Sequence, residues 1–488
     1  MLPKPDELFD RQTEWSELAA FVTDDRLGAT LALLYGRRRQ GKTLLLEHLA
    51  HAAGGLLVTG LEQSAAMNLR SVGTDYASYL GSAAPVAFSS WEQAVEALLA
   101  LGESDRPVPV IIDEFPYLLA GSPELPSILQ RALSPRGRAR LNSRARLILC
   151  GSAFSTMRDL LSGTAALRGR ARRELVVHPF DYRQAATFWQ LDGHWELALR
   201  VHALCGGTPA YLDYCGGDTP RTLKELDGWV HRNLLNPSSA FFREGRLLVG
   251  EEPDLRNAAL YLSVLAALSL GNTRRGQLAA ALGRKESALA HPLAALQETR
   301  LVEARRDALR ERRTTYHITE PILRLHQLVV APEEARLTRR AAGQVWTELA
   351  DMVSSKIYGP HFEQLCRQWA AEHAADATLG GRPSSVGSSV LTCPAHRSTH
   401  EFDLVVTEKT AGAVARICAI GEAKWRTEPV GLAQLERLRH LRSLLPQPAV
   451  PVRLLLFSRT GFAPPLRQSA AASEDVELVD LERLYVGS

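Results

Sequence analysis

The chain has 488 residues, too many for a single hydrophobic core, and we expect about three or four domains. With 45% hydrophobic residues, 23% charged residues and a net charge of +3, it has the composition of ordinary soluble proteins and no charge excess that indicates nucleic acid. It has no membrane-length apolar run, no signal-peptide pattern at the N-terminus and no metal-like cysteine spacing, so we expect a cytoplasmic protein without membrane or zinc.

Short apolar strands alternate with helical stretches in the first part of the chain. The predicted strands are Thr30–Tyr35, Leu56–Thr59, Val108–Ile112, Leu147–Gly151 and Glu174–Val177. Continuous apolar runs separated by helices indicate a parallel sheet that is covered on both faces. Residues 181–248 follow as a helical region with a break at Gly206–Pro209.

The pattern changes near Asn257. We expect one helix to Leu268, further helices over Arg275–Leu282 and Ser287–Glu298, and two short strands, Leu301–Glu303 and Thr315–Ile318. This order is typical of a helix-turn-helix followed by a β-wing. From about Ala341 the chain continues as mixed helix and strand, with a loop at Gly380–Ser385.

The first predicted strand leads into a phosphate-loop pattern, G-x-x-x-x-G-K-[ST]. The pattern is matched by Gly36, Arg37, Arg38, Arg39, Gln40, Gly41, Lys42 and Thr43. Its glycines let backbone N–H groups approach phosphate oxygens, and the N-terminus of the next helix adds positive potential. We expect Lys42 to neutralise the β- and γ-phosphates of ATP, and Thr43 to hold Mg²⁺.

Acidic and polar residues follow two later strands. Asp113 and Glu114 lie where ligands bind in such sheets, so Asp113 is expected to hold magnesium and Glu114 to polarise the attacking water. Ser152 either orients that water or caps a helix. Arg168 and Arg170 are candidates for an arginine finger toward a neighbouring subunit, or are simply solvated.

Residues 402–424 carry a second group of charged residues. Glu422 and Lys424 are two apart on a predicted strand and should point together toward Asp403 on the adjacent strand. The carboxylates suit magnesium, Lys424 can stabilise charge on a scissile phosphate, and Glu363 on a preceding helix can add a ligand. This D…E-x-K order with helix, strand, strand and helix is that of the restriction-endonuclease-like core. A surface Glu–Lys pair on a hairpin is the alternative.

The winged-helix segment offers basic residues for DNA. Arg284 and Lys285 begin its third helix, and Arg305 and Arg306 lie in the wing. A basic wing beside a helix-turn-helix is consistent with phosphate contacts. The alternative is that the unit only packs between domains.

Taken together, these motifs resemble the archaeal-type AAA-like ATPases with a C-terminal restriction-endonuclease-like domain. The resemblance covers nearly the whole chain and is carried by Phe9–Glu14, the phosphate loop, Asp113–Leu118, Gly151–Ser152, Leu167–Arg170, Pro179–Phe180, Gly206–Leu212, Phe402–Val405 and Gly421–Trp425. It implies that the first of these segments, with Arg11, flanks the adenine and that Arg170 is the better finger. Gln12 replaces a more usual glutamate.

The fold class expected is therefore α/β, with a P-loop ATPase core over residues 1–180, a helical lid over 181–250, a winged helix over 251–335 and a restriction-endonuclease-like domain over 341–488. The expected function is an ATP-regulated, magnesium-dependent DNA endonuclease, possible as a homo-oligomer. A nucleotide-dependent switch with a non-cutting C-terminal module is the alternative. A transcription regulator is disfavoured because there is one winged helix and no small-ligand domain.

Overall fold

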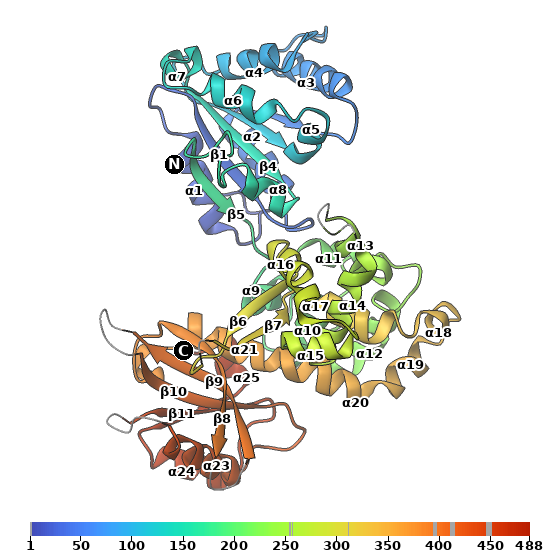
Figure 1. Ribbon diagram of the computed structural model, residues 1–488, viewed down its shortest axis with the longest axis vertical. Helices are drawn as coiled ribbons and strands as arrows, with labels where there is room; N and C mark the ends of the chain where they lie inside the picture. Colours follow the sequence, from blue (N-terminus) through green and yellow to red (C-terminus); the bar gives the residue numbers. More distant parts are fainter. Residues whose placement is uncertain are drawn as a thin grey trace. The chain divides into compact units, whose positions relative to one another are not determined.

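The computed structural model describes residues 2–252, 255, 257–310, 312–393, 398–409, 415–445 and 451–488. They form two compact units, Met1–Pro179 with Thr208–Ala210, and Phe180–Gly207 with Tyr211–Ser488 (Figure 1). Across these described ranges, no helix is both long and apolar enough to span a bilayer.

The first unit contains a parallel sheet in the order β2-β3-β4-β1-β5. Its strands are β1 Thr30–Tyr35, β2 Leu56–Thr59, β3 Val108–Asp113, β4 Ala145–Gly151 and β5 Ala171–Val176. All five strands agree with the predicted ones to within a few residues. Tyr35 is level with Gly151 on one side and Val176 on the other, so the carboxyl ends of these strands share one edge.

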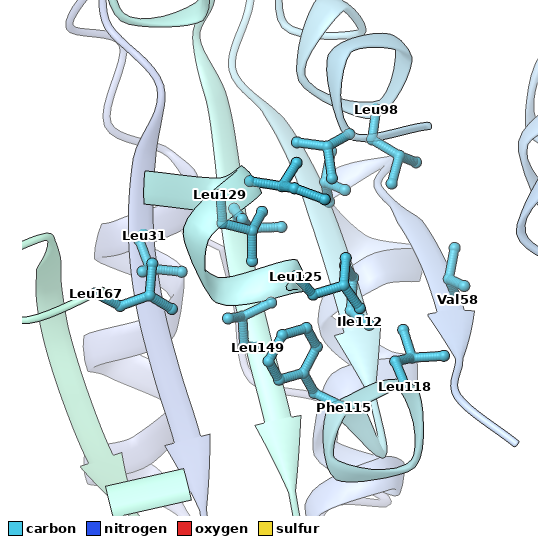
Figure 2. Close-up of a cluster of buried hydrophobic side chains, with 14 of the residues drawn as sticks. Leu31, Val58, Leu98, Ile112, Phe115, Leu118, Leu125, Leu129, Leu149 and Leu167 are labelled. Carbon is cyan, nitrogen blue, oxygen red and sulfur yellow. The ribbon is translucent and has the colours of Figure 1, made fainter. Parts of the chain in front are cut away.

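Helices cover both faces of this sheet because successive strand residues point to opposite sides. Ala32 and Leu34 pack with helices α1 (Gln12–Val22) and α2 (Lys42–Ala53). Leu31 and Leu33 belong to the opposite cluster. That second cluster joins the sheet to α3 (Ala65–Tyr79), α4 (Trp91–Ala100), α5 (Phe115–Gly121), α6 (Leu125–Ala132) and α8 (Phe154–Asp159), and Figure 2 shows part of it. The short helix α7 covers Arg138–Asn142.

The second unit begins with helices and contains the predicted break. The helices are α9 Tyr182–Phe188, α10 Trp195–Cys205, α11 Ala210–Tyr214, α12 Leu223–Asn233 and α13 Phe241–Gly250. A Cβ atom on Gly207 would lie 1.8 Å from the carbonyl oxygen of Phe180, so only glycine permits this approach. The hydroxyl of Tyr182 donates to the carbonyl oxygen of Leu484, which ties α9 to the distant helix α25 (Leu481–Val486).

The predicted three helices and paired strands follow. They are α14 Ala258–Ser269, α15 Arg275–Ala281, a 3₁₀ turn over Glu286–Leu289 continued by α16 Ala290–Glu298, and the antiparallel pair β6 Val302–Arg306 and β7 Thr314–Ile318. The third helix was expected as one piece. It is split near Pro292, which lacks an N–H donor and crowds the preceding turn. The N–H of Ala308, beyond β6, donates to the carbonyl of Ser388 at 3.0 Å, so the hairpin packs on β8.

Short helices lead to the final sheet. They are α17 Pro321–Leu325 with a π-helical extension over His326–Val330, α18 Glu334–Thr338, α19 Ala342–Glu348, α20 Ala350–Val353 with a π-helical extension over Ser354–Tyr358, α21 Gly359–Glu372 and α22 Asp376–Leu379.

The final sheet has the order β12-β11-β10-β9-β8. It consists of β8 Ser385–Cys393, β9 Ser398–Glu408, β10 Arg416–Lys424, β11 Arg453–Ser458 and β12 Val476–Val479, with α23 Leu432–Ser443 and α24 Pro464–Ala471. Strands β8, β9 and β10 pair antiparallel, whereas β10, β11 and β12 pair parallel. The sequence prediction missed β8, whose serine and glycine content hides its alternation. The predicted turn at Thr410–Gly412 lies outside the described residues.

The core of the first unit makes a stability prediction. Leu149 is fully buried on the central strand β4, so Leu149→Ala should lower the free energy of unfolding of this unit by about 2–5 kcal/mol. Hydrogen exchange of peptides from residues 1–179, measured against urea concentration, checks this. Leu141→Ala is the matched control, since Leu141 is 55% exposed and should change stability by less than about 0.5 kcal/mol. Equal effects of both variants would contradict this packing.

Candidate functional site

The loop between β1 and α2 is held open by backbone conformation. Arg39 and Gly41 have φ angles of 68° and 81°, in the left-handed region. A Cβ atom on Gly36 would lie 2.4 Å from the carbonyl oxygen of Val177, so a side chain cannot fit there. These features leave backbone N–H groups lining a concave turn at the N-terminus of α2, which is the form of an anion-binding loop.

Lys42 lies inside this loop. Its side chain is only 5% exposed, and Nζ donates to the carbonyl oxygen of Arg37 at 2.8 Å. Burial lowers the pKa of Lys42, while Glu114 and Asp113 favour its charged form. The ammonium is therefore desolvated and held at the loop, ready to meet a second anion.

Thr43 and Asp113 meet across the carboxyl edge of the sheet. Thr43 Oγ1 donates to Asp113 Oδ2 at 2.7 Å, and Asp113 Oδ1 accepts from the N–H of Glu114 at 2.9 Å. A hydroxyl and a carboxylate side by side are hard oxygen donors that fit Mg²⁺. The residues present therefore suit a magnesium ion beside the phosphate loop.

Glu114 and Ser152 extend the same edge. Glu114 precedes α5 in a left-handed conformation, with φ of 48°. Ser152 Oγ donates to Glu114 Oε1 at 3.0 Å, so the hydroxyl orients the carboxylate. A strained non-glycine residue at such a place is typical of functional sites.

Arg11 has a structural role that the sequence prediction did not include. Its Nη2 donates to the carbonyl oxygen of Gln40 at 3.1 Å, and its Nη1 pairs with Glu14 at 3.1 Å. Arg11 itself is 5% exposed, and burial lowers the pKa of its guanidinium. The side chain thus supports the phosphate loop from behind. Another loop arginine, Arg38, donates from Nη2 to the hydroxyl of Tyr117 at 2.6 Å.

Arg170 lies at the opposite edge of the sheet. It directly precedes β5, where Ala171 is level with Leu31 near the start of β1. The phosphate loop follows the other end of β1, about five residues or ~16 Å further along the strand. Arg170 therefore does not reach the phosphate loop of its own chain. Arg168 donates to the carbonyl of Gly163 at 2.5 Å.

In the second unit, the structure brings Asp403, Glu422 and Lys424 together. Lys424 Nζ lies 3.8 Å from Asp403 Oδ2 and 3.4 Å from Glu422 Oε2. Asp403 Oδ2 also accepts from the N–H of Ala423 at 2.9 Å. Strands β9 and β10 position the three side chains at adjacent places in the antiparallel ladder.

Two further residues complete this carboxylate cluster. Arg437 on α23, which the sequence prediction missed, lies 2.5 Å from Glu422 Oε1 through Nη1. Glu422 is 1% exposed, and its buried Oε2 has no hydrogen-bond partner among the described residues. Glu363 on α21 has its pKa raised to about 7 by burial and by Asp403. A buried, incompletely satisfied set of carboxylate oxygens fits a divalent cation.

The four predicted DNA contacts separate into two groups. Arg284, Lys285 and Arg306 are exposed. Arg305 is instead paired with Glu303, its side chain is 23% exposed, and burial and Arg367 lower its pKa. Alternate residues of a strand face opposite sides, which explains why Arg305 turns inward where Arg306 does not.

Comparisons with known proteins agree with the first unit. Residues 8–214 match a family described as an ATPase domain predominantly from Archaea. An uncharacterized protein of Methanocaldococcus jannaschii is 24% identical over 306 residues, 62% of this chain and 64% of that protein. The chain thus spans less than two thirds of that curated relative.

Solved structures show the same fold. The Walker-type ATPase of Pyrococcus abyssi is similar with a TM-score of 0.50 and 21% identity, covering 66% of this chain and 97% of that one. The ORC2 protein of Aeropyrum pernix, in ADPNP and ADP complexes, has a TM-score of 0.43 and 18% identity over 71% of this chain and 97% of its own. The family match and the sheet topology identify residues 8–214 as an archaeal-type ATPase domain.

Proposed function

We propose that the protein binds and hydrolyses ATP with Mg²⁺, and that nucleotide state controls magnesium-dependent DNA cleavage by residues 341–488. The hydrogen bond between Thr43 and Asp113, beside the buried Lys42, carries the first part. The cluster of Asp403, Glu422 and Lys424 supports the second. The two parts are separable by experiment.

In the ATPase site each residue has one role. Backbone N–H groups of residues 36–43 and Lys42 hold the phosphates, and Thr43 and Asp113 hold Mg²⁺, which neutralises charge developing on the phosphates. Glu114, oriented by Ser152, accepts a hydrogen bond from the attacking water. Arg170 serves as a finger only toward a second copy of the chain, so this role requires a homo-oligomer.

For the C-terminal part we propose a restriction-endonuclease-like fold. The order α21, β8, β9, β10, α23, β11 places Asp403 and Glu422 on neighbouring strands of a mixed sheet. Asp403, Glu422 and Glu363 supply oxygen ligands for a divalent ion, which activates a water. Lys424 stabilises the charge that builds on the phosphorus oxygens as the water attacks and the P–O bond breaks.

We further propose that residues 257–318 form a winged helix and contact DNA through Arg284, Lys285 and Arg306. These cations are exposed, in contrast to Arg305. Such contacts to phosphates position a nucleic acid without reading its sequence.

A second function is favoured by one specific observation. Arg437 and Lys424 both pair with Glu422, so cations already neutralise this carboxylate without any metal. Ion-pair networks of this kind also occur with a purely structural role. The alternative is therefore a nucleotide-dependent switch whose C-terminal module does not cut.

The ATPase assignment makes a paired prediction. Lys42→Ala should abolish ATP binding and turnover, because the desolvated ammonium is lost from the phosphate loop. Glu114→Gln should retain ATP affinity but lower kcat by about 100-fold or more, because the water loses its acceptor. Calorimetry for binding and phosphate release for turnover check both. Unchanged turnover in Lys42→Ala would refute the loop assignment.

The cleavage assignment is tested with supercoiled plasmid DNA and Mg²⁺ or Mn²⁺, with and without ATP. The wild-type protein should nick the plasmid, and Asp403→Asn should stop the reaction because a metal ligand is lost. Asp376→Asn, an exposed carboxylate in the same unit, is the matched control and should cut normally. Absence of nicking by the wild type would favour the non-cutting switch, and cleavage surviving in Asp403→Asn would exclude this cluster.

Arg11 allows base contact to be separated from loop support. If Arg11 acts by holding the carbonyl of Gln40, Arg11→Gln should weaken ATP and GTP binding alike, by about tenfold. Titration with both nucleotides measures this, with exposed Arg70→Gln as control. A loss confined to ATP would show instead that Arg11 contacts the adenine.

A further inference from the structure

A cavity of about 340 Å³ lies within the second unit, lined by residues of β6, β7, α17, α21 and β8. Its charged lining is unequal. The cations are Arg274, Arg305, Arg313, Arg324, Lys356 and Arg367, and the carboxylates are Asp307, Glu363 and Glu401. Six cations against three carboxylates leave the cavity with an excess of positive charge.

Three of these arginines lie close enough to repel one another. Burial lowers the pKa of Arg324 to about 10, and Arg305 and Arg367 lower it further toward that value. Burial lowers the pKa of His317 to about 2, with the same three arginines contributing, so this histidine is neutral. Like charges in a region of low dielectric are costly unless an anion faces them.

The protein satisfies this cluster only in part. Arg305 pairs with Glu303, and Arg367 donates from Nη1 to the carbonyl oxygen of Asp403 at 2.8 Å. The Nε atom of Arg367 is buried without a hydrogen-bond partner. Arg324 makes no hydrogen bond or ion pair with any residue that the structure describes.

The carboxylates nearby do not compensate fully. Asp307 accepts from Ser389 Oγ at 2.6 Å and lies 3.9 Å from Arg313, so it is already engaged at the rim. The pKa values of Glu363 and Glu401 are both raised, first by burial, so their negative charge is disfavoured. The cavity therefore has guanidinium donors in search of acceptors.

Shape and chemistry indicate which anion fits. Planar guanidinium groups match the tetrahedral oxygens of phosphate and bind them with charge-assisted hydrogen bonds. A volume of about 340 Å³ is at the small end of ligand pockets and suits a nucleotide-sized group. The pairing of Asp307 with Ser389 and of Ala308 with Ser388 holds the hairpin against β8, so the walls exist before any ligand arrives.

We propose that this cavity binds the phosphate of a nucleotide-sized ligand, with Arg305, Arg324 and Arg367 as its contacts. The phosphate has two possible sources, a nucleotide unit of a DNA strand or a free nucleotide. Glu363 lines the cavity and interacts electrostatically with Asp403, so a bound strand would continue toward the carboxylate cluster. Binding here does not depend on cleavage.

The test uses the full chain carrying Lys42→Ala, which suppresses phosphate binding at the ATPase loop. Fluorescence anisotropy with labelled hexathymidylate probes the strand, and calorimetry with pyrophosphate probes a free phosphate ligand. Arg324→Gln should weaken at least one of them by about tenfold or more. Exposed Arg339→Gln is the matched control and should bind both normally.

The pattern of losses identifies the source. Loss of hexathymidylate alone assigns the cavity to a strand, and loss of pyrophosphate alone assigns it to a free nucleotide. Arg324→Gln should also melt at the same or a higher temperature without ligand, because repulsion is relieved. If it fails to fold, Arg324→Lys keeps the charge without the fork and should still bind more weakly.

Affinities within twofold of the parent for both probes, in a folded Arg324 variant, would overturn the proposal. Asp403→Asn should keep full affinity for the cavity ligand. Failure of cleavage and failure of this site are therefore observed separately.

Discussion

The hydrogen bond between Thr43 and Asp113 depends on the whole of the first unit. Thr43 follows β1 and Asp113 ends β3, and β4 lies between these two strands. The two side chains meet only because all three strands are parallel and in register, so that their carboxyl ends reach one edge. The buried leucines on both faces hold that register, since a shift by one residue would turn every strand side chain to the wrong face. The site is thus a consequence of the core.

Backbone strain accompanies this arrangement. Arg11, Arg39 and Glu114 have positive φ angles, in conformations that cost non-glycine residues about 1–3 kcal/mol each. Hydrogen bonds from Arg11 to Gln40 and from Ser152 to Glu114 help to retain them. Strain placed where phosphates and water are expected to bind preorganises the donors and acceptors, which need not rearrange when the ligand arrives.

Much of this was readable in the sequence because the signals are local. The phosphate loop and the strand ending in Asp113 and Glu114 are short motifs, and the strands of the first unit are continuous apolar runs. Strand β8 was missed because its residues are mostly small and polar. Arg437 and the inward turn of Arg305 were missed for another reason. Their positions are set by packing between segments far apart in the chain, which no local pattern reports.

The contact between Tyr182 and Leu484 has a consequence for biosynthesis. These residues are 302 positions apart, and the bond joins the start of the second unit to α25. Nearly all of the first unit lies within residues 1–179, so it can fold while the ribosome is still translating the rest. Helix α9 must wait for residues 481–486 before its packing is complete. During translation, a finished ATPase core therefore precedes an open second unit whose apolar surfaces are exposed to chaperones.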